Sequence, residues 1–367
     1  MTEQPNDTSR AWVEIDLGAL MRNGAAIARH AGVPLLPMVK ADAYGIGVAG
    51  AVRALEPLEP WGYGVATVGE GAELRELGIT RSILVFTPLL PPDFAAARAK
   101  RLTPVLGDPH AIARWTETPA AWHLGIDTGM GRAGARWDRL AEILPLVTAS
   151  PPEGACTHFH SAHDPASVRV QRARFQAAIA ALPSRPTVLH AENGPAAERL
   201  SAPSEMDVIR PGIFLYGVSS GEGARIEPEP VVHVRARVVE VREIDAGEAV
   251  SYEATWRAPS PRRVATLGIG YADGYRRALS NRGEVLIGGK RARVVGLVTM
   301  DMTMLDVTDT DAALGDVVTL LGRDGDDLIT ATELAALGDL SPYELLTGLR
   351  TRLPRVHRDV EDAEAAA

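Results

Sequence analysis

Residues 154–193 read GACTHFHSAHDPASVRVQRARFQAAIAALPSRPTVLHAEN, and this stretch contains one complete unit of the fold. Its two ends, Gly154–His160 and Thr187–Asn193, are short runs rich in apolar residues. Between them, the apolar residues of Ser167–Leu182 recur at the spacing of a helix. The stretch therefore predicts a strand, a covering helix and a second strand parallel to the first.

The same pattern extends in both directions, from about residue 34 to residue 217. The apolar runs are Pro34–Lys40, Tyr63–Val68, Ser82–Pro88, Leu102–Asp108, Ala121–Asp127, Gly154–His160, Thr187–Asn193 and Val208–Gly217. Eight strand–helix units predict an α/β fold with an N-terminal (β/α)8 TIM barrel, whose parallel strands are buried on both faces.

After Gly217 the pattern changes to strand-like runs rich in β-branched residues and separated by Gly, Asp and Pro turns. This change predicts a mostly β C-terminal domain. We expect the barrel domain to span residues 10–230, the β domain residues 231–360, and a disordered acidic tail residues 361–367. The opening strand, about residues 11–16 (AWVEID), could pair with the C-terminal domain.

Length and charge limit the classes of function. The chain has 367 residues, and 38 basic against 47 acidic side chains give a formal net charge of −9. That balance argues against nucleic acid and anionic membranes as partners, because both require a basic surface. There is no run of about 18 apolar residues and no apolar leader, and Cys156 is the only cysteine. We therefore expect a cytoplasmic enzyme.

Polar residues gather at the C-terminal ends of the predicted barrel strands, where barrel enzymes carry their active sites. Lys40 ends the first strand, in the sequence Val39–Gly45. Partial burial there would lower the pKa of its amine, and a neutral amine can form a Schiff base with a carbonyl such as that of pyridoxal phosphate (PLP). The alternative is a solvated lysine on a loop.

Arg132 lies in the glycine-rich sequence Asp127–Gly134 (DTGMGRAG), after the fifth strand. A guanidinium at the barrel mouth suits bidentate binding of a carboxylate; the alternative is a surface ion pair. The glycine spacing also matches a dinucleotide-binding motif, but that motif belongs in the first strand–helix unit of its fold.

Three histidines stand close together in Thr157–Asp164 (THFHSAHD). His158 and His160 share one face of the predicted strand, which leaves open a metal-dependent barrel hydrolase. Such a site needs further ligands, and His110, His123 and His190 are available in the sequence. Histidines that support neighbouring residues are the alternative.

Loops after strands seven and eight of a barrel commonly bind phosphate. Here they contain Asn193 and Gly194, and then Arg210, Gly212 and Ile213. Glycines in such loops let backbone N–H groups approach an anion closely.

The second domain contributes two further motifs, Gly268–Tyr275 (GIGYADGY) and Thr299–Asp301 (TMD). Tyr271 closes a predicted strand, and a tyrosine in such a place can act as an acid or base. An interface or core tyrosine is the alternative.

Taken together, these motifs resemble those of the alanine racemases. The sequences VKADAYGIG, IDTGMGRAG, THFHSA, HAENG, IRPGIFLYG, VSYEATW, GIGYADGY, TMDMTMLDV and LPRV occur in that family's order across nearly the whole chain. The resemblance implies a PLP-binding barrel, a β domain and a homodimer with shared active sites. It also implies interconversion of L- and D-alanine by two-base proton transfer on a PLP external aldimine, which supplies D-alanine for peptidoglycan.

The resemblance also implies roles for individual residues. Lys40 would hold PLP and act as one base, and Tyr271 would be the opposing base, supplied by the partner subunit. The cofactor contacts would come from Tyr44, His158, Asn193, Gly194, Arg210, Gly212 and Ile213. Arg132 and Met300 would contact the substrate, and His158 would link Arg210 to Tyr271.

Several departures from the family occur, and two of them, Gly125 and Thr351, affect the expected substrate preference and turnover. Thr351 replaces a tyrosine that often stands at that position in the family. Many members carry a carbamylated lysine that orients the arginine corresponding to Arg132, and this chain has Gly125 at that position. The substrate range therefore stays open, with a serine or broad-specificity racemase as the alternative within the family. A PLP carrier without catalysis is disfavoured, because a carrier needs no second base.

Overall fold

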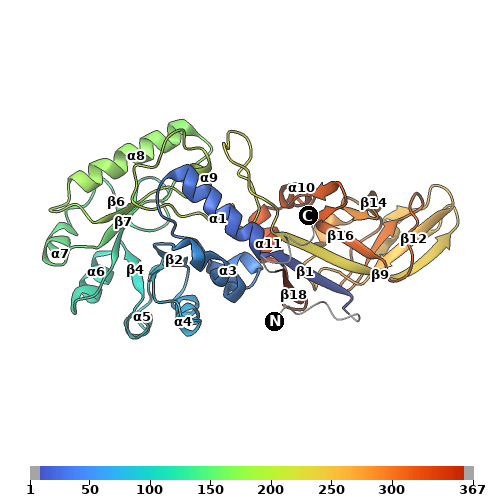
Figure 1. Ribbon diagram of the computed structural model, residues 1–367, viewed down its shortest axis with the longest axis horizontal. Helices are drawn as coiled ribbons and strands as arrows, with labels where there is room; N and C mark the ends of the chain where they lie inside the picture. Colours follow the sequence, from blue (N-terminus) through green and yellow to red (C-terminus); the bar gives the residue numbers. More distant parts are fainter. Residues whose placement is uncertain (1–8, 359–367) are drawn as a thin grey trace.

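The computed structural model describes residues 9–358, which form two lobes along the long axis of the molecule (Figure 1). The predicted tail, residues 361–367, lies outside the described residues. One lobe is a barrel of parallel strands surrounded by helices, and the other is a mostly antiparallel β domain. The predicted fold class is confirmed.

Parallel strands adjacent in the chain are also neighbours in the barrel wall. They are β2 (Gly62–Val65), β3 (Ser82–Val85), β4 (Thr103–Leu106), β5 (His123–Asp127), β7 (Gly154–Cys156) and β8 (Val188–His190), with β6 (Ala135–Arg136) beside β5. The helices of this lobe are α1 (Leu17–Ala31), α2 (Lys40–Gly45), α3 (Val48–Leu55), α4 (Val68–Glu76), α5 (Asp93–Ala99), α6 (Pro109–Thr116), α7 (Leu144–Ala149), α8 (Pro165–Ala180) and α9 (Gly194–Glu198). The strands are almost wholly buried, which explains their continuous apolar sequences.

Two segments that the sequence predicts as full strands close the barrel through single bridges only. The bridges are Leu35–Ile209, Met38–Gly64 and Asn193–Arg210, all parallel. Pro34, Pro37 and Pro211 lack the N–H group that a continuous ladder needs. The circle of eight is therefore complete, but its first and last members are irregular.

The second lobe is built around the long strand β9 (Val232–Ile244). Its main sheet has the order β17-β16-β13-β14-β15-β12-β9-β1-β18, and an additional β16–β9 pairing closes part of it into a ring. The other members are β1 (Ala11–Asp16), β12 (Arg262–Leu267), β13 (Glu284–Ile287), β14 (Lys290–Val294), β15 (Thr303–Asp306), β16 (Val317–Asp324), β17 (Asp327–Ile329) and β18 (Arg355–Arg358). The small strands β10 (Ala249–Val250) and β11 (Trp256–Arg257) pair separately, and α10 (Ala331–Leu337) and α11 (Pro342–Thr347) complete the lobe.

The chain starts in the β lobe and then crosses to the barrel. Strand β1 pairs with β9 and β18, and Asp16 at its end caps α1 by accepting a hydrogen bond from the Ala19 amide at 2.7 Å. Gly32 ends α1 in the left-handed conformation, with φ of 68°. Among residues 9–358, no helix has both the length and the apolar character needed to cross a membrane.

Candidate active site

Lys40 begins α2, a left-handed turn at the barrel mouth. The next four residues, Ala41–Tyr44, have φ between 51° and 57°. Such a turn costs about 1–2 kcal/mol per residue for L-amino acids. The Glu70 carboxylate accepts a hydrogen bond from the Ala41 amide at 2.8 Å, and the Asp42 carboxylate accepts one from the Val48 amide at 2.7 Å. These contacts fix the lysine on a rigid support, which the sequence did not predict.

The Lys40 side chain lines a cavity of about 450 Å³. Burial lowers the pKa of its amine, the positive charge of Arg132 lowers it further, and Glu70 opposes the shift. At a given pH, a larger fraction of this amine is therefore neutral than in a solvated lysine. Such an amine can attack a carbonyl or accept a proton.

One end of this cavity presents hydrogen-bond donors without partners. The backbone N–H groups of Gly194, Gly212 and Ile213, and the hydroxyl of Tyr44, donate to no acceptor among residues 9–358. Burial raises the pKa of Tyr44 well above its ordinary value, so its hydroxyl stays protonated. A Cβ atom on Gly212 would lie 2.4 Å from the Tyr44 oxygen, so only glycine leaves this approach open. Four such donors suit a phosphate group.

Arg210 lies at the other side of the cavity and is itself buried. Its Nη1 donates to the Nδ1 atom and the carbonyl oxygen of His190, at 2.9 and 2.6 Å. Its Nη2 donates to the carbonyl oxygens of Thr157 and Ala191. The Nε–H group has no acceptor within residues 9–358. Arg210 can therefore donate that remaining hydrogen bond into the cavity.

His158 and Asn193 lie beside Arg210 in the same cavity. The Asn193 amide nitrogen is 3.4 Å from His158 Nε2. Burial and the nearby charges of Arg210, Arg132 and Lys40 lower the pKa of His158 to about 3. His158 is therefore neutral, and no hydrogen bond joins it to Arg210 within the described chain.

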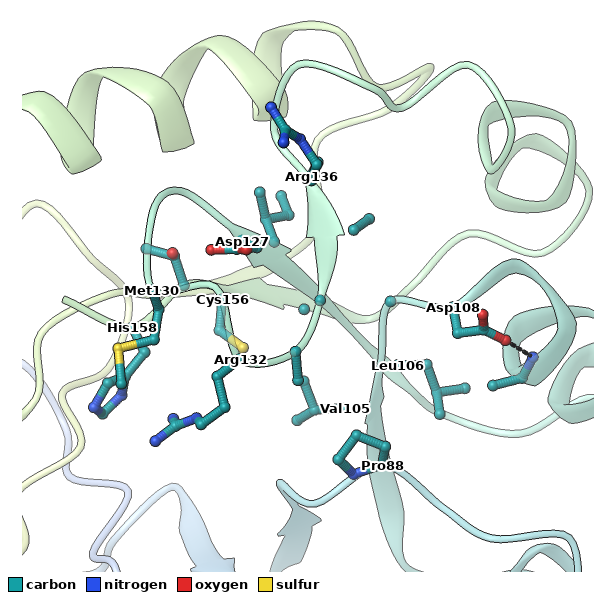
Figure 2. Close-up of a pocket in the computed structure, with 18 of the residues that line it drawn as sticks. Pro88, Val105, Leu106, Asp108, Asp127, Met130, Arg132, Arg136, Cys156 and His158 are labelled. Carbon is teal, nitrogen blue, oxygen red and sulfur yellow. Dashed lines mark hydrogen bonds between the residues drawn. The ribbon is translucent and has the colours of Figure 1, made fainter. Parts of the chain in front are cut away.

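Arg132 connects this cavity to a second one of about 550 Å³. Its loop is folded around Asp127, which accepts hydrogen bonds from the amides of Gly129 and Gly131 at 2.9 and 3.1 Å. In Figure 2 the Arg132 side chain extends away from Arg136, which pairs with Asp138 at 2.9 Å. Gly125 also lines the second cavity, and a Cβ atom on it would lie 3.0 Å from Val105 Cγ1.

The structure does not bring Tyr271 and Met300 into the cavity of their own chain. Neither residue lines the cavity that contains Lys40. Both belong to the β lobe, and the two residues are 40% and 53% exposed. Within one chain, Tyr271 and Met300 therefore lie outside the site. The other predicted site residues line one cavity: Lys40, Tyr44, Arg132, His158, Asn193, Gly194, Arg210, Gly212 and Ile213.

The histidine motif does not form a metal site in the described part of the chain. Strand β7 ends at Cys156, so His158 and His160 are not on one strand. Both line one cavity, but only His158 also lines the cavity that contains Lys40. The His160 ring is exposed and lies 2.7 Å from the Ser161 hydroxyl. Within residues 9–358, no three His, Cys, Asp or Glu side chains are grouped closely enough to hold a metal ion.

The residues around Lys40 fit PLP. A lysine amine stands where the aldehyde would attach, unpaired donors suit the phosphate, and the Nε–H of Arg210 can face the pyridine nitrogen. The sequence offered His190 only as a distant metal ligand and gave no indication that it supports Arg210. The signal was its position, at the end of the strand next to that of Arg210.

Comparisons with known proteins agree with this geometry. Residues 15–220 match the family model of the alanine racemase N-terminal domain, and residues 231–357 match that of the C-terminal domain. An alanine racemase of Symbiobacterium thermophilum is 39% identical over 365 residues, which cover 94% of this chain and 96% of that protein.

Solved structures extend the likeness to three dimensions. An alanine racemase of Bartonella henselae with covalently bound pyridoxal phosphate superposes with a TM-score of 0.88 at 28% identity, covering 95% of this chain and 100% of that one. A histidine racemase of Leuconostoc mesenteroides superposes with a TM-score of 0.86 at 27% identity, covering 96% and 99%. The same fold therefore accompanies more than one named amino-acid substrate.

Proposed function

The chain belongs to the alanine racemase family, and on that premise we propose how its residues divide the work of interconverting L- and D-alanine. The observation that carries this division is the separation of the two candidate bases. Lys40 lies inside a cavity with phosphate and carboxylate donors, whereas Tyr271 is exposed on the other lobe. D-Alanine made in this way supplies peptidoglycan.

Racemisation requires removal of a proton from one face of Cα and its return to the other. PLP, when bound, supplies the electron-withdrawing group that acidifies the α-proton of the attached amino acid. Lys40 holds the cofactor and exchanges the proton on one face, and Tyr271 exchanges it on the other. Two bases of similar strength on opposite faces allow both directions to proceed.

The other cavity residues bind and orient. Tyr44, Gly194, Gly212 and Ile213 hold the phosphate, and Asn193 and His158 contact the cofactor from beside Arg210. Arg210 keeps its proton under all ordinary conditions, so its Nε–H would face the pyridine nitrogen without protonating it. A cofactor held in this way would favour proton transfer at Cα over side reactions such as transamination.

Arg132 binds the substrate carboxylate, because its guanidinium extends into the cavity close enough to Lys40 to depress the pKa of the amine. Gly125 has no side chain, so this chain orients Arg132 without the modified lysine. The histidine racemase shows that proteins of this fold differ in the amino-acid side chain they accept. Alanine is the substrate that the curated relatives of this chain support.

We propose a homodimer in which each Tyr271 and Met300 complete the partner's site. The exposure of both side chains supports this arrangement, since neither reaches its own Lys40 cavity. We place the enzyme in the cytoplasm, because its single cysteine, Cys156, is buried and free, as is usual for proteins of a reducing compartment. Sedimentation and cell fractionation test these two statements.

The direct test of the reaction follows the alanine α-proton in deuterated water. The purified protein should absorb as a PLP enzyme, and borohydride should fix the cofactor on a peptide containing Lys40. Deuterium should appear in both enantiomers. A protein that stays colourless after addition of PLP would overturn the assignment and return attention to the histidines.

A further inference from the structure

The loop that presents Tyr271 is fastened to the loop that presents Met300. The amides of Tyr271 and Ala272 donate to the carbonyl oxygens of Thr299 and Met300, both at 3.0 Å. A Cβ atom on Gly270 would lie 2.3 Å from the Thr299 oxygen, so the two backbones are in direct contact. The two residues proposed to enter the partner's site therefore move as one unit.

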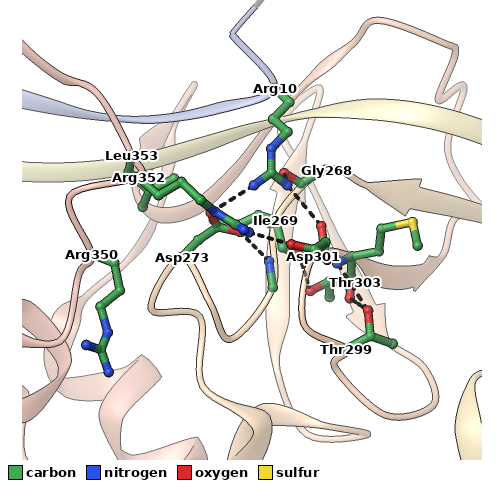
Figure 3. A network of polar contacts seen from close by, with 12 residues as sticks. Arg10, Gly268, Ile269, Asp273, Thr299, Asp301, Thr303, Arg350, Arg352 and Leu353 are labelled. Atoms are coloured by element: carbon green, nitrogen blue, oxygen red, sulfur yellow. Dashed lines mark hydrogen bonds and ion pairs between the residues drawn. The ribbon is translucent and has the colours of Figure 1, made fainter.

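Asp273 is the centre of the contacts that hold this unit (Figure 3). Its carboxylate is completely buried. It accepts from Arg10 at 3.0 Å, from Arg352 at 2.6 and 3.0 Å, and from the Gly270 amide at 2.9 Å. A buried carboxylate is stable only with such partners, and the two arginines among them come from opposite ends of the chain.

The same two arginines also hold the second loop. Arg10 donates to the Gly268 carbonyl at 2.6 Å and to the Asp301 carbonyl at 3.1 Å. Arg352 donates to the Asp301 carboxylate at 2.7 Å. Bidentate arginine contacts fix orientation as well as distance. Asp273 is therefore the shared anchor of both loops.

The Tyr271 side chain has no such support of its own. Its hydroxyl makes no hydrogen bond to another described residue, and Tyr271 as a whole is 40% exposed. Within its own chain, the position of the Tyr271 ring is therefore set mainly by the backbone of its loop. We propose that Asp273 is a positioning residue that aims Tyr271 and Met300 into the partner's active site, an inference that rests on the proposed role of Tyr271 as a base.

The first test measures loop anchoring without cofactor or activity. Hydrogen–deuterium exchange of the cofactor-free Asp273→Asn protein should be about tenfold or more faster in peptides covering 268–275 and 299–303, and unchanged elsewhere. The control is Asp327→Asn, which breaks another bidentate arginine pair of the β lobe, with Arg291 at 2.9 and 3.1 Å. Unchanged exchange in the two loops overturns the inference.

The second test asks whether anchoring matters for Tyr271. If the tyrosine is displaced, Lys40 can still remove the α-proton of the enantiomer whose proton faces it and return deuterium to that same face. The ratio of exchange in that enantiomer to conversion into the other should therefore rise at least about fivefold. This ratio does not depend on how much protein is folded, so loss of stability alone cannot move it.

Arg352→Gln, which alters a half-exposed partner of Asp273, repeats the test if Asp273→Asn does not fold. The expected result is a raised ratio in these variants, approaching that of Tyr271→Phe, and a wild-type ratio in Asp327→Asn. Faster loop exchange with a wild-type ratio overturns the positioning role. A wild-type ratio in Tyr271→Phe instead overturns the proposed base, which separates the two failures.

Discussion

Arg210 fixes the tautomer of His190, because an arginine can only donate and its Nη1 lies 2.9 Å from His190 Nδ1. His190 must then carry its proton on Nε2, which is 2.8 Å from His123 Nδ1. His123 in turn carries its proton on Nε2, 3.9 Å from the Glu153 carboxylate. Two neutral imidazole rings, those of His190 and His123, therefore connect Arg210 to the start of β5.

These histidines make the fold sensitive to acid. Burial and Arg210 lower the pKa of His123 to about 3 and that of His190 well below its ordinary value, and His158 is also lowered to about 3. The unfolded chain takes up these protons near pH 6.5, whereas the folded chain does not. The free energy of unfolding should therefore fall as pH drops below 6.5, by about 1.4 kcal/mol per pH unit for each histidine.

Urea unfolding of the cofactor-free protein between pH 7.5 and pH 5 measures this slope. The matched variant is His123→Gln, which keeps an acceptor for His190 and removes one titrating ring, so its slope should be shallower. A free energy of unfolding that is constant from pH 7 to pH 5 would contradict the assignment of neutral buried histidines.

Replacing Lys40 removes the attachment point for the cofactor. Lys40→Ala should retain no PLP after borohydride and dialysis, and should fold normally because the side chain lies in a cavity rather than in the core. Intact-protein mass spectrometry and circular dichroism check both statements. Covalent PLP on the variant would show that another lysine holds the cofactor.

Gly212→Ala should weaken PLP binding without blocking attachment to Lys40. The added methyl group would stand 2.4 Å from the hydroxyl oxygen of Tyr44, whose ring stacks on Tyr216 at 4.7 Å and cannot move freely. We expect the dissociation constant to rise about tenfold or more, equivalent to about 1.4 kcal/mol.

Fluorescence titration of the cofactor-free variant with PLP provides the measurement. Gly69→Ala is the control, because a Cβ atom there meets only Thr67 Oγ1, at 3.8 Å. If Gly212→Ala and Gly69→Ala bound PLP with equal affinity, the phosphate would not lie against Gly212 and Tyr44.

Arg132→Gln should raise KM for alanine more than it lowers kcat. A hydrogen bond to a charged group contributes about 1.5–3 kcal/mol, which corresponds to roughly 10- to 100-fold in KM. The pKa of Lys40 should rise as well, because the arginine's charge depresses it. Steady-state kinetics across pH test both effects, and an unchanged KM would remove Arg132 from the substrate site.

The sequence predicted the barrel because buried parallel strands leave continuous apolar runs. It placed Lys40 at the end of the first run and Arg210 within the last one. It could not predict the left-handed turn after Lys40, since no glycine occupies Ala41–Tyr44 to signal positive φ. Nor could it predict Arg10 or Arg352 as partners of Asp273, 263 and 79 residues away. Long-range ion pairs leave no local pattern.

The central claim is that each active site combines Lys40 of one subunit with Tyr271 of the other. Co-expression of Lys40→Ala and Tyr271→Phe subunits with different tags gives a mixed dimer that can be purified. With shared sites, one of its two sites is intact, so the dimer should have about half of wild-type activity, although each parent dimer is nearly inactive. Activity no higher than that of the parents would contradict the claim, because each site would then carry one defect of its own chain.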